Sequence, residues 1–202
     1  MTFSRNPDSD KATSHEREYL EMAFSPSSGP LRSRWRNNGL SADFLGDYVA
    51  TFMPSNDGGA VLEKQQSRIK HAVAYIANEL LENAMKYHQR DVDIPVRIDL
   101  ELTGDHITVS VSNGASQSQA QNYAKFVAQL RAGDASELFL QQQEKSAKCG
   151  EAEVSCVGLL TMIIDYDALM DWRFEVHPVQ RESMIVTTSA VLLLDNILGA
   201  SA

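Results

Sequence analysis

The chain has 202 residues, of which 43% are hydrophobic, and it carries a formal net charge of -9. This length suits one well-packed domain and is too short for two of ordinary size. The acidic balance opposes an extended phosphate-binding surface, which needs clustered Lys and Arg, so no nucleic-acid partner is expected. No apolar run approaches the roughly 18 to 20 residues that span a membrane. The first residues also lack the apolar stretch of a signal peptide, so we expect a cytoplasmic protein with no membrane contact.

Chain organisation is predicted from apolar periodicity. Residues 1–16 are polar and aperiodic, which indicates a mobile leader, and a single domain is expected over residues 17–197. A short strand is predicted at residues 19–24, followed by a helix at residues 40–52, with Ser41 and Asp43 near its N-terminus. The apolar positions of residues 60–87 keep helical spacing without an internal Gly or Pro, which predicts a long helix.

The second half of the chain begins with a predicted antiparallel hairpin, in which residues 96–102 and 107–112 alternate apolar and polar side chains around the turn "TGD". Residues 113–150 are rich in Gln, Ser and Ala, and residues 115–150 are predicted to form a lid. A buried helix is expected at residues 156–166, and strands at residues 171–177 and 184–194 close the chain. This order predicts an α+β sandwich, a mixed, mostly antiparallel sheet covered on one face by three helices.

The two cysteines, Cys149 and Cys156, are seven positions apart, a spacing that fits neither a CxxC redox motif nor a paired zinc half-site. Two inert thiols in a reducing compartment are the preferred interpretation.

The long helix carries an unusual polar edge within "NELLENAMKYH", residues 78–88. At 100° per residue, the apolar positions from Val73 to Tyr87 face the sheet, whereas Glu79 and Asn83 lie together at the border of that apolar arc. Such a border position can line a cleft beside the core. The alternative is a solvated helix shoulder with an i, i+4 contact worth a few tenths of a kcal/mol.

The stretch "ELLENAMKYH" resembles the N-box of the GHKL superfamily, the Bergerat-fold ATPases that include sensor histidine kinases and anti-sigma serine kinases. The resemblance implies a histidine-kinase-like ATPase fold that binds ATP and Mg²⁺. It implies that Glu79 is the general base and that the side-chain carbonyl of Asn83 binds Mg²⁺. It further implies that Lys86 reaches the nucleotide phosphates and that Tyr87 stacks on adenine.

The glycine boxes of that superfamily are only partly present. At the end of the predicted strand, Ser112-Asn113-Gly114-Ala115-Ser116 stands where the family has Asp-x-Gly-x-Gly, so Ser112 replaces the acid that binds the adenine amino group. Exchange of a charge-assisted bond for a neutral one costs on the order of 1 to 2 kcal/mol. The second box is reduced to Gly158 ahead of the buried helix. Lys145 or Lys148 of the lid, and one threonine of the pair at 187 and 188, are further candidates by resemblance.

Within the superfamily, the order of elements is similar to that of small stand-alone anti-sigma-factor kinases of bacterial signalling, some of which are encoded beside STAS-like (anti-sigma-antagonist-like) proteins. The resemblance therefore implies a serine/threonine kinase that phosphorylates a STAS-like partner protein, with a homodimer plausible by analogy. The alternative is a non-catalytic binding module whose altered glycine boxes have removed ATP turnover and which sequesters its partner.

Overall fold

The structure of this chain, a computed structural model, describes residues 17–25, 31–53, 59–89, 93–140 and 157–199. Its elements are, in chain order, β1 (Glu18–Phe24), α1 (Leu31–Ala50), α2 (Gly59–Tyr87), β2 (Val96–Leu102), β3 (His106–Ser116), α3 (Gln117–Ala132), α5 (Val157–Tyr166), β4 (Leu169–Val176), β5 (Ser183–Leu193) and α6 (Leu194–Gly199). Residues 135–140 are also helical. The predicted leader, both cysteines, Lys145, Lys148 and the end of the predicted lid lie outside the described residues.

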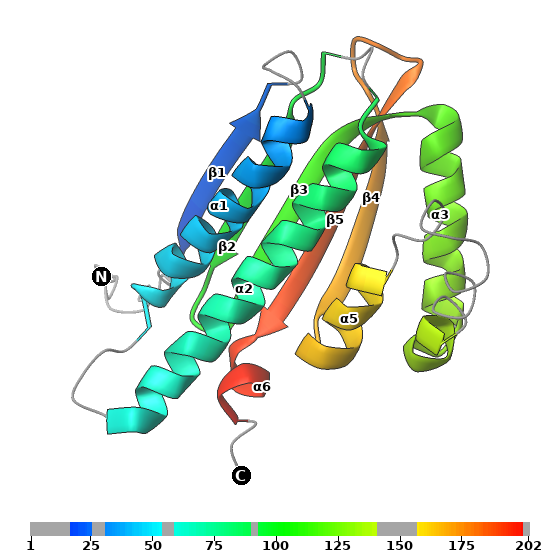
Figure 1. Cartoon of the computed structure of the whole chain (residues 1–202). Helices are drawn as coiled ribbons and strands as arrows, with labels where there is room; N and C mark the ends of the chain where they lie inside the picture. The colour runs from blue at the N-terminus through cyan, green and yellow to red at the C-terminus, as the bar shows by residue number, and fades with distance from the viewer. Residues whose placement is uncertain (1–16, 26–30, 54–58, 90–92, 141–156, 200–202) are drawn as a thin grey trace, which may run out of the picture.

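The strands form one sheet in the order β1-β2-β3-β5-β4, and all four pairings are antiparallel. Helices α1, α2 and α5 lie over the same face of this sheet, with α2 crossing its centre (Figure 1). The predicted α+β sandwich is confirmed. None of the described helices is long and apolar enough to cross a membrane.

Side chains of the central strands alternate between the two faces of the sheet, and those on the helical side form the core. In β2 every second side chain is buried, from Val96 to Leu102, and β3 continues the pattern with Ile107, Val109 and Val111. The facing stripe of α2 is buried to the same degree: Ile69, Val73, Ile76 and Leu80 are each at most 2% exposed. Because a fully buried aliphatic side chain stabilises by about 1.5 to 3 kcal/mol, this stripe fixes the rotation of α2 and with it the position of its polar edge.

Helix α1 packs closely against the N-terminal half of α2. A β-carbon built at Gly46 would lie 2.7 Å from the backbone oxygen of Lys70, so the glycine permits the close approach. The Gln66 side chain donates to the Ala50 carbonyl at 3.0 Å, and Lys70 forms an ion pair with Asp47. These contacts hold α1 and α2 antiparallel.

A smaller cluster joins α3 to α5 and β4. It contains Val127, Leu130, Leu160 and Trp172, with Phe126 and Phe139 partly buried against it. Arg131 lies 5.5 Å from the centre of the Trp172 ring and pairs with Asp171 at 3.1 Å. The outer edge of the helical layer thus has its own apolar contacts.

Several element boundaries differ from the sequence predictions, and one helix is additional. Helix α1 begins at Leu31 rather than near Leu40, because the core-facing spacing of Ala42, Leu45 and Val49 extends back to the buried Asn38. Strand β3 continues to Ser116 because its residues pair with β5 along their whole length. The short helix α6 after β5 was not predicted.

Candidate functional site

The carboxylate of Glu79 lies against the first turn of α5. A β-carbon built at Gly158 would be 2.0 Å from Oε2 and 2.8 Å from Cδ of Glu79, so only a glycine admits the carboxylate here. Gly158 is the second residue of α5, whose N-terminal backbone amides carry partial positive charge. Two residues that the sequence singled out separately are therefore in direct contact.

Burial and a neighbouring carboxylate change the pKa of Glu79. Removal from water raises the pKa of the Glu79 carboxyl, and the nearby Glu82 carboxylate raises this pKa further. Glu82 itself accepts a hydrogen bond from the Asn78 amide at 2.9 Å. Glu79 is consequently a stronger base than an ordinary surface carboxylate.

Two tyrosines join α2 to α5 below Glu79. The rings of Tyr75 and Tyr166 are stacked with centroids 5.1 Å apart and an interplanar angle of 21°. Burial raises the pKa of Tyr75 and outweighs the lowering effect of the Thr161 side chain. We call these contacts, together with the one between Glu79 and Gly158, the α2–α5 seam.

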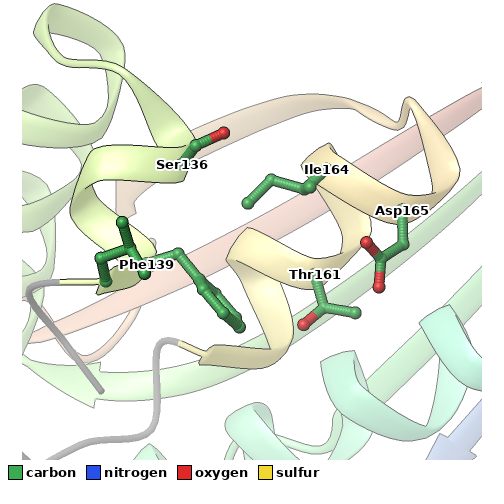
Figure 2. A pocket seen from close by; sticks show the side chains of 6 residues that line it. Ser136, Phe139, Thr161, Ile164 and Asp165 are labelled. Carbon is green, nitrogen blue, oxygen red and sulfur yellow. The ribbon is translucent and has the colours of Figure 1, made fainter. Parts of the chain in front are cut away.

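The other side of α5 borders a surface pocket of about 230 Å³ (Figure 2). Its lining residues come from α5 and from the helical segment 135–140: Ser136, Phe139, Leu140, Thr161, Ile164 and Asp165. Phe139 faces α5 across the pocket (Figure 2). Thr161 belongs to both the seam and the pocket.

The other candidate residues of the stretch that resembles an N-box follow Glu79 toward the end of α2. Asn83, one helical turn later, is half-buried, and its side-chain nitrogen is enclosed. Lys86 is exposed, with its Nζ 5.4 Å from the centre of the Tyr87 ring, and Tyr87 is 41% exposed. Tyr87 therefore does not extend the buried apolar arc predicted for it. Among the described residues, no group of three or more His, Cys, Asp and Glu is placed to hold a metal ion.

The structure does not bring Ser112 to this site. Ser112 lies opposite Arg97 on β2 and Thr187 on β5, and it alternates with the buried Val111 and Asn113. Its side chain therefore faces the side of the sheet away from the helices. Because Glu79 and Gly158 lie on the helical side, Ser112 and Glu79 are separated by the sheet.

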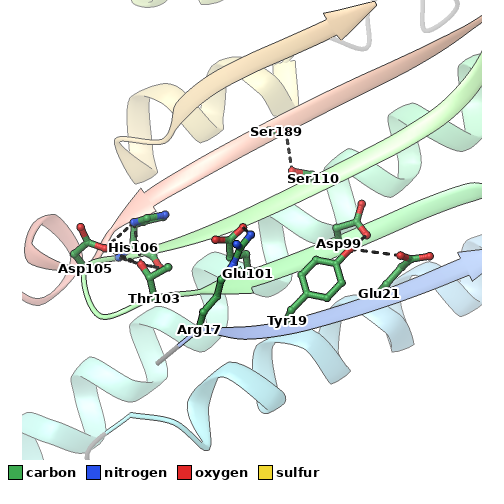
Figure 3. Close-up of polar contacts among 10 residues, drawn as sticks. All are labelled: Arg17, Tyr19, Glu21, Asp99, Glu101, Thr103, Asp105, His106, Ser110 and Ser189. Carbon is green, nitrogen blue, oxygen red and sulfur yellow. Dashed lines mark hydrogen bonds and ion pairs between the residues drawn. The ribbon is translucent and has the colours of Figure 1, made fainter. Parts of the chain in front are cut away.

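That open face carries its own polar contacts (Figure 3). Ser110 and Ser189 share a hydrogen bond of 2.8 Å across β3 and β5. Toward the β1 edge, the Tyr19 hydroxyl donates to Asp99 at 2.8 Å, and this bond is the main cause that raises the pKa of Tyr19 to about 12. The open face that carries Ser112 therefore also has polar side chains that hydrogen-bond to one another across neighbouring strands.

Asn113 is the polar residue at this end of β3 that does face the helices. It is 7% exposed, and its side-chain nitrogen donates to the Gly114 carbonyl at 3.1 Å. The same carbonyl accepts the backbone N–H of Gln89 at 2.9 Å, and a β-carbon on Gly114 would lie 3.0 Å from Ile94. Gln89 and Ile94 therefore both contact the end of β3 at Gly114.

A hydrogen-bonded group between α3 and the sheet joins Thr188, one of the two candidate threonines, to Tyr123 and Trp172, which the sequence did not single out. Trp172 donates its ring N–H to the Tyr123 oxygen at 3.0 Å, and Tyr123 shares a 3.2 Å hydrogen bond with Thr188. Of the threonine pair, Thr188 is buried on the helical side and Thr187 alternates to the open face. The sequence signal that could have placed Trp172 on the helical side was the alternation of Trp172 and Phe174 with polar residues in β4.

No protein-family model matches this chain, and no curated protein sequence matches it either. Its fold is similar to that of a chain in the crystal structure of the SiaB–SiaC complex from Pseudomonas aeruginosa. The TM-score is 0.57 at 15% sequence identity, and the match covers 86% of this chain and 89% of that chain. At this level of identity, the similarity establishes the fold alone.

Proposed function

We propose that this chain is a regulator of the GHKL type that binds ATP with Mg²⁺ beside α2 and α5 and transfers the terminal phosphoryl group to a protein partner. One observation carries this proposal: the N-box carboxylate, Glu79, is packed on a glycine in the first turn of a helix. A helix N-terminus next to a half-buried carboxylate suits phosphate binding and proton acceptance at one place.

The described residues fit such a ligand. The side-chain oxygen of Asn83 is of the kind that Mg²⁺ prefers, and a single protein ligand is enough because Mg²⁺ is commonly bound through few protein groups plus phosphates and water. Bound Mg²⁺ would neutralise charge on the phosphates. Lys86, exposed one turn after Asn83 on the same helix, would reach the phosphates from solvent.

Glu79 would act as the general base. In the proposed transfer, the oxygen of a partner Ser or Thr hydroxyl bonds to the γ-phosphorus, the bond from that phosphorus to the β–γ bridging oxygen breaks, and ADP leaves. The hydroxyl proton goes to Glu79, whose raised pKa strengthens it as an acceptor. Because its carboxylate lies against the first turn of α5, Glu79 would be near any phosphates bound at that helix N-terminus.

The proposed partner is a STAS-like protein, as the resemblance to anti-sigma-factor kinases implies. The similar fold in the SiaB–SiaC complex supports a protein partner, because that solved structure holds two different proteins together. A homodimer of this chain is part of the same proposal, by the same resemblance.

A second candidate function, a binding module without ATP turnover, is favoured by the course of β3. Residues 112–116 pair with β5 as a regular strand, and Ser112 points to the open face. A glycine loop that wraps a nucleotide would interrupt this pairing. On this alternative, the chain holds its partner without transferring phosphate.

Thermal unfolding with millimolar ATP, with and without Mg²⁺, tests nucleotide binding. A ligand at 100 times its dissociation constant stabilises the native state by about 2.7 kcal/mol, a shift of several degrees for a protein of this size. We expect a Mg²⁺-dependent shift in the native chain that disappears in Asn83→Ala. Phosphoryl transfer to a co-purified STAS-like partner, lost in Glu79→Ala, separates the kinase from the binding module; binding of the partner without transfer supports the module.

A further inference from the structure

We propose that the open face of the sheet binds a phosphoryl group through a row of four side chains, which are those of Arg97, Ser112, Thr187 and Arg173. We call this set the arginine row. It lies on the side of the sheet away from Glu79, so it is separate from the proposed nucleotide site and does not rest on the proposed function. Inorganic phosphate and a phosphorylated protein side chain are two sources of the same chemical group.

The strand register aligns the arginine row across four neighbouring strands. Arg97 on β2 lies opposite Ser112 on β3, which in turn lies opposite Thr187 on β5. Arg173 on β4 lies opposite Thr187 from the other side. Directly opposite residues point to the same face of a sheet, so all four side chains leave it on the open side. Because neighbouring strands are about 4.8 Å apart, a group centred over the two hydroxyls lies about 7 Å from the Cα of each arginine, a distance that an arginine side chain spans.

The adjacent row on the same strands, which we call the acidic row, consists of Asp99, Ser110, Ser189 and Asp171. Its two serines share a hydrogen bond of 2.8 Å, and Asp99 accepts one from Tyr19 at 2.8 Å (Figure 3). Asp171 pairs with Arg131 at 3.1 Å. Every side chain of the acidic row therefore has a partner within the protein.

Three side chains of the arginine row differ in this respect. Within the described part of the chain, Ser112, Thr187 and Arg173 make no side-chain hydrogen bond or ion pair. Ser112 and Thr187 are half-buried and Arg173 is exposed, so two hydroxyls form a floor with a guanidinium at its edge. Arg97 pairs with Glu21 at 2.9 Å, but the two side chains are 49% and 40% exposed, and such a surface pair contributes little. A ligand can therefore take Arg97 from Glu21.

The donors of the arginine row fit a tetrahedral oxyanion. A guanidinium only donates hydrogen bonds, and each hydroxyl has one hydrogen to donate. Two guanidiniums that approach from opposite sides, with two hydroxyls below, meet the several oxygens of a phosphoryl group better than the two oxygens of a carboxylate.

The surrounding charges favour a phosphorylated protein segment over the free ion. Asp99 and Asp171 lie one row away, beside Glu21 on β1, and Glu175 follows Arg173 on the open face of β4. These carboxylates repel a free anion and attract a cation beside it. Alternate residues of a strand lie about 6.6 to 6.8 Å apart on one face, as the two rows do. An extended segment with a phosphoserine and a lysine two residues later would therefore match the arginine row and the acidic row together.

Binding is measured by NMR titration of the isotope-labelled full chain at constant ionic strength, with the backbone amides of β3 and β5 and the Arg173 side-chain N–H as reporters. The ligands are inorganic phosphate, the peptide acetyl-alanyl-phosphoseryl-alanyl-lysine amide, and the same peptide without phosphate. Ser112→Ala and Arg173→Gln each remove donors from the arginine row. Ser110→Ala, at the next open-face position of β3, is the matched control, and Lys64→Gln at an exposed position of α2 controls for the loss of one positive charge.

We expect saturable shifts centred on the arginine row, with affinity for inorganic phosphate in roughly the millimolar range and tighter binding of the phosphorylated peptide. Arg173→Gln and Ser112→Ala should each weaken binding of that peptide by about tenfold, the change expected for one hydrogen bond to a charged group. Glu21→Gln releases Arg97 and removes a negative charge, so it should tighten binding by up to about fivefold. Ser110→Ala and Lys64→Gln should bind the peptide as the native chain does.

Equal binding by the native chain, Arg173→Gln and Ser112→Ala, or shifts that spread over the surface without saturation, would overturn the site. Equal binding of the peptide with and without phosphate would overturn its specificity for a phosphoryl group. Tighter binding of inorganic phosphate than of the phosphorylated peptide would contradict the contribution of the acidic row. ATP is absent from this titration, so the proposed function stands or fails independently of the result.

Discussion

Single residues determine whether Glu79 can occupy its place against α5. The far end of the Glu79 side chain lies inside the space that a β-carbon on Gly158 would fill. Gly158→Ala should therefore displace the carboxylate, because a flexible side chain moves more easily than two helices. In the native background, this loss offsets the higher helix propensity of Ala, which is up to about 1 kcal/mol more favourable than Gly.

A double-mutant cycle isolates that contact. In a Glu79→Ala background, the space beside Gly158 is empty, and Gly158→Ala is expected to stabilise the protein by up to about 1 kcal/mol. Urea unfolding of the four proteins measures the coupling free energy. The same effect of Gly158→Ala in both backgrounds would show that the two residues do not interact.

The pH dependence of stability is a second consequence at this scale. Burial raises the pKa of Glu79 in the folded state, so the native protein binds its proton more tightly than the unfolded chain. Stability is therefore lost as the pH rises from the ordinary Glu pKa through the raised one, and below both values no penalty remains. Glu79→Gln cannot ionise and should be more stable than the native chain at pH 7, by less than about 1 kcal/mol because the carboxyl is only partly buried.

Urea unfolding at pH 4 and pH 7 measures this difference. Glu63→Gln, a matched change at an exposed position of α2, controls for the loss of one negative charge. A Glu79→Gln protein that is less stable than the native chain at pH 7 would contradict the expected sign, since it would mean that the carboxylate makes a net favourable contact.

Among the elements, β3 shows how far sequence reasoning reaches and where it stops. The alternation of Ile107, Val109 and Val111 with polar residues correctly predicted the hairpin and its buried face. The same alternation put Ser112 with Thr108 and Ser110 on the polar side of the strand. The family resemblance nevertheless gave Ser112 a role in adenine binding, so the signal for the open face was present but was outweighed by the motif.

Other differences had no local signal. Glu79 and Asn83 could be placed at the border of the core because helical periodicity fixes directions around one axis. Their contact with α5 depends on how two helices far apart in sequence pack, and no single-helix pattern contains that information. The early start of α1 was hidden because Asn38 is polar although it occupies a core position.

Two adjacent substitutions on β3 test which of its faces meets the nucleotide. Ser112→Asp restores the acid of the family motif at its expected position, but on the open face, whereas Asn113→Asp puts the same acid on the helical face. Under the proposed function, Asn113→Asp should tighten ATP binding by roughly 5- to 30-fold, the worth of a charge-assisted hydrogen bond in place of a neutral one. Ser112→Asp should change the affinity for ATP by less than about twofold, because its carboxylate would lie on the open face.

Calorimetric titration with ATP and Mg²⁺ measures both affinities. Tighter binding in Ser112→Asp alone would mean that adenine binds on the open face of the sheet. That result would contradict the position of the site that we infer from the strand register.

For the molecule as a whole, the division of the buried apolar residues into one large cluster and two small ones should govern how the fold opens. The large cluster joins α1, α2 and α5 to the sheet, whereas α3 contributes only Ala120, Val127 and Leu130 as buried residues. Burial of apolar area is the main favourable contribution to the free energy of folding, so α3 should open locally at a lower free energy than α2 and β3.

Native-state hydrogen exchange in increasing denaturant measures these opening free energies element by element. Leu130→Ala should lower the opening free energy of α3 while leaving that of α2 almost unchanged. If α3 and α2 instead exchange with the same free energy, the Tyr123, Trp172 and Thr188 hydrogen bonds must couple these clusters into one cooperative unit.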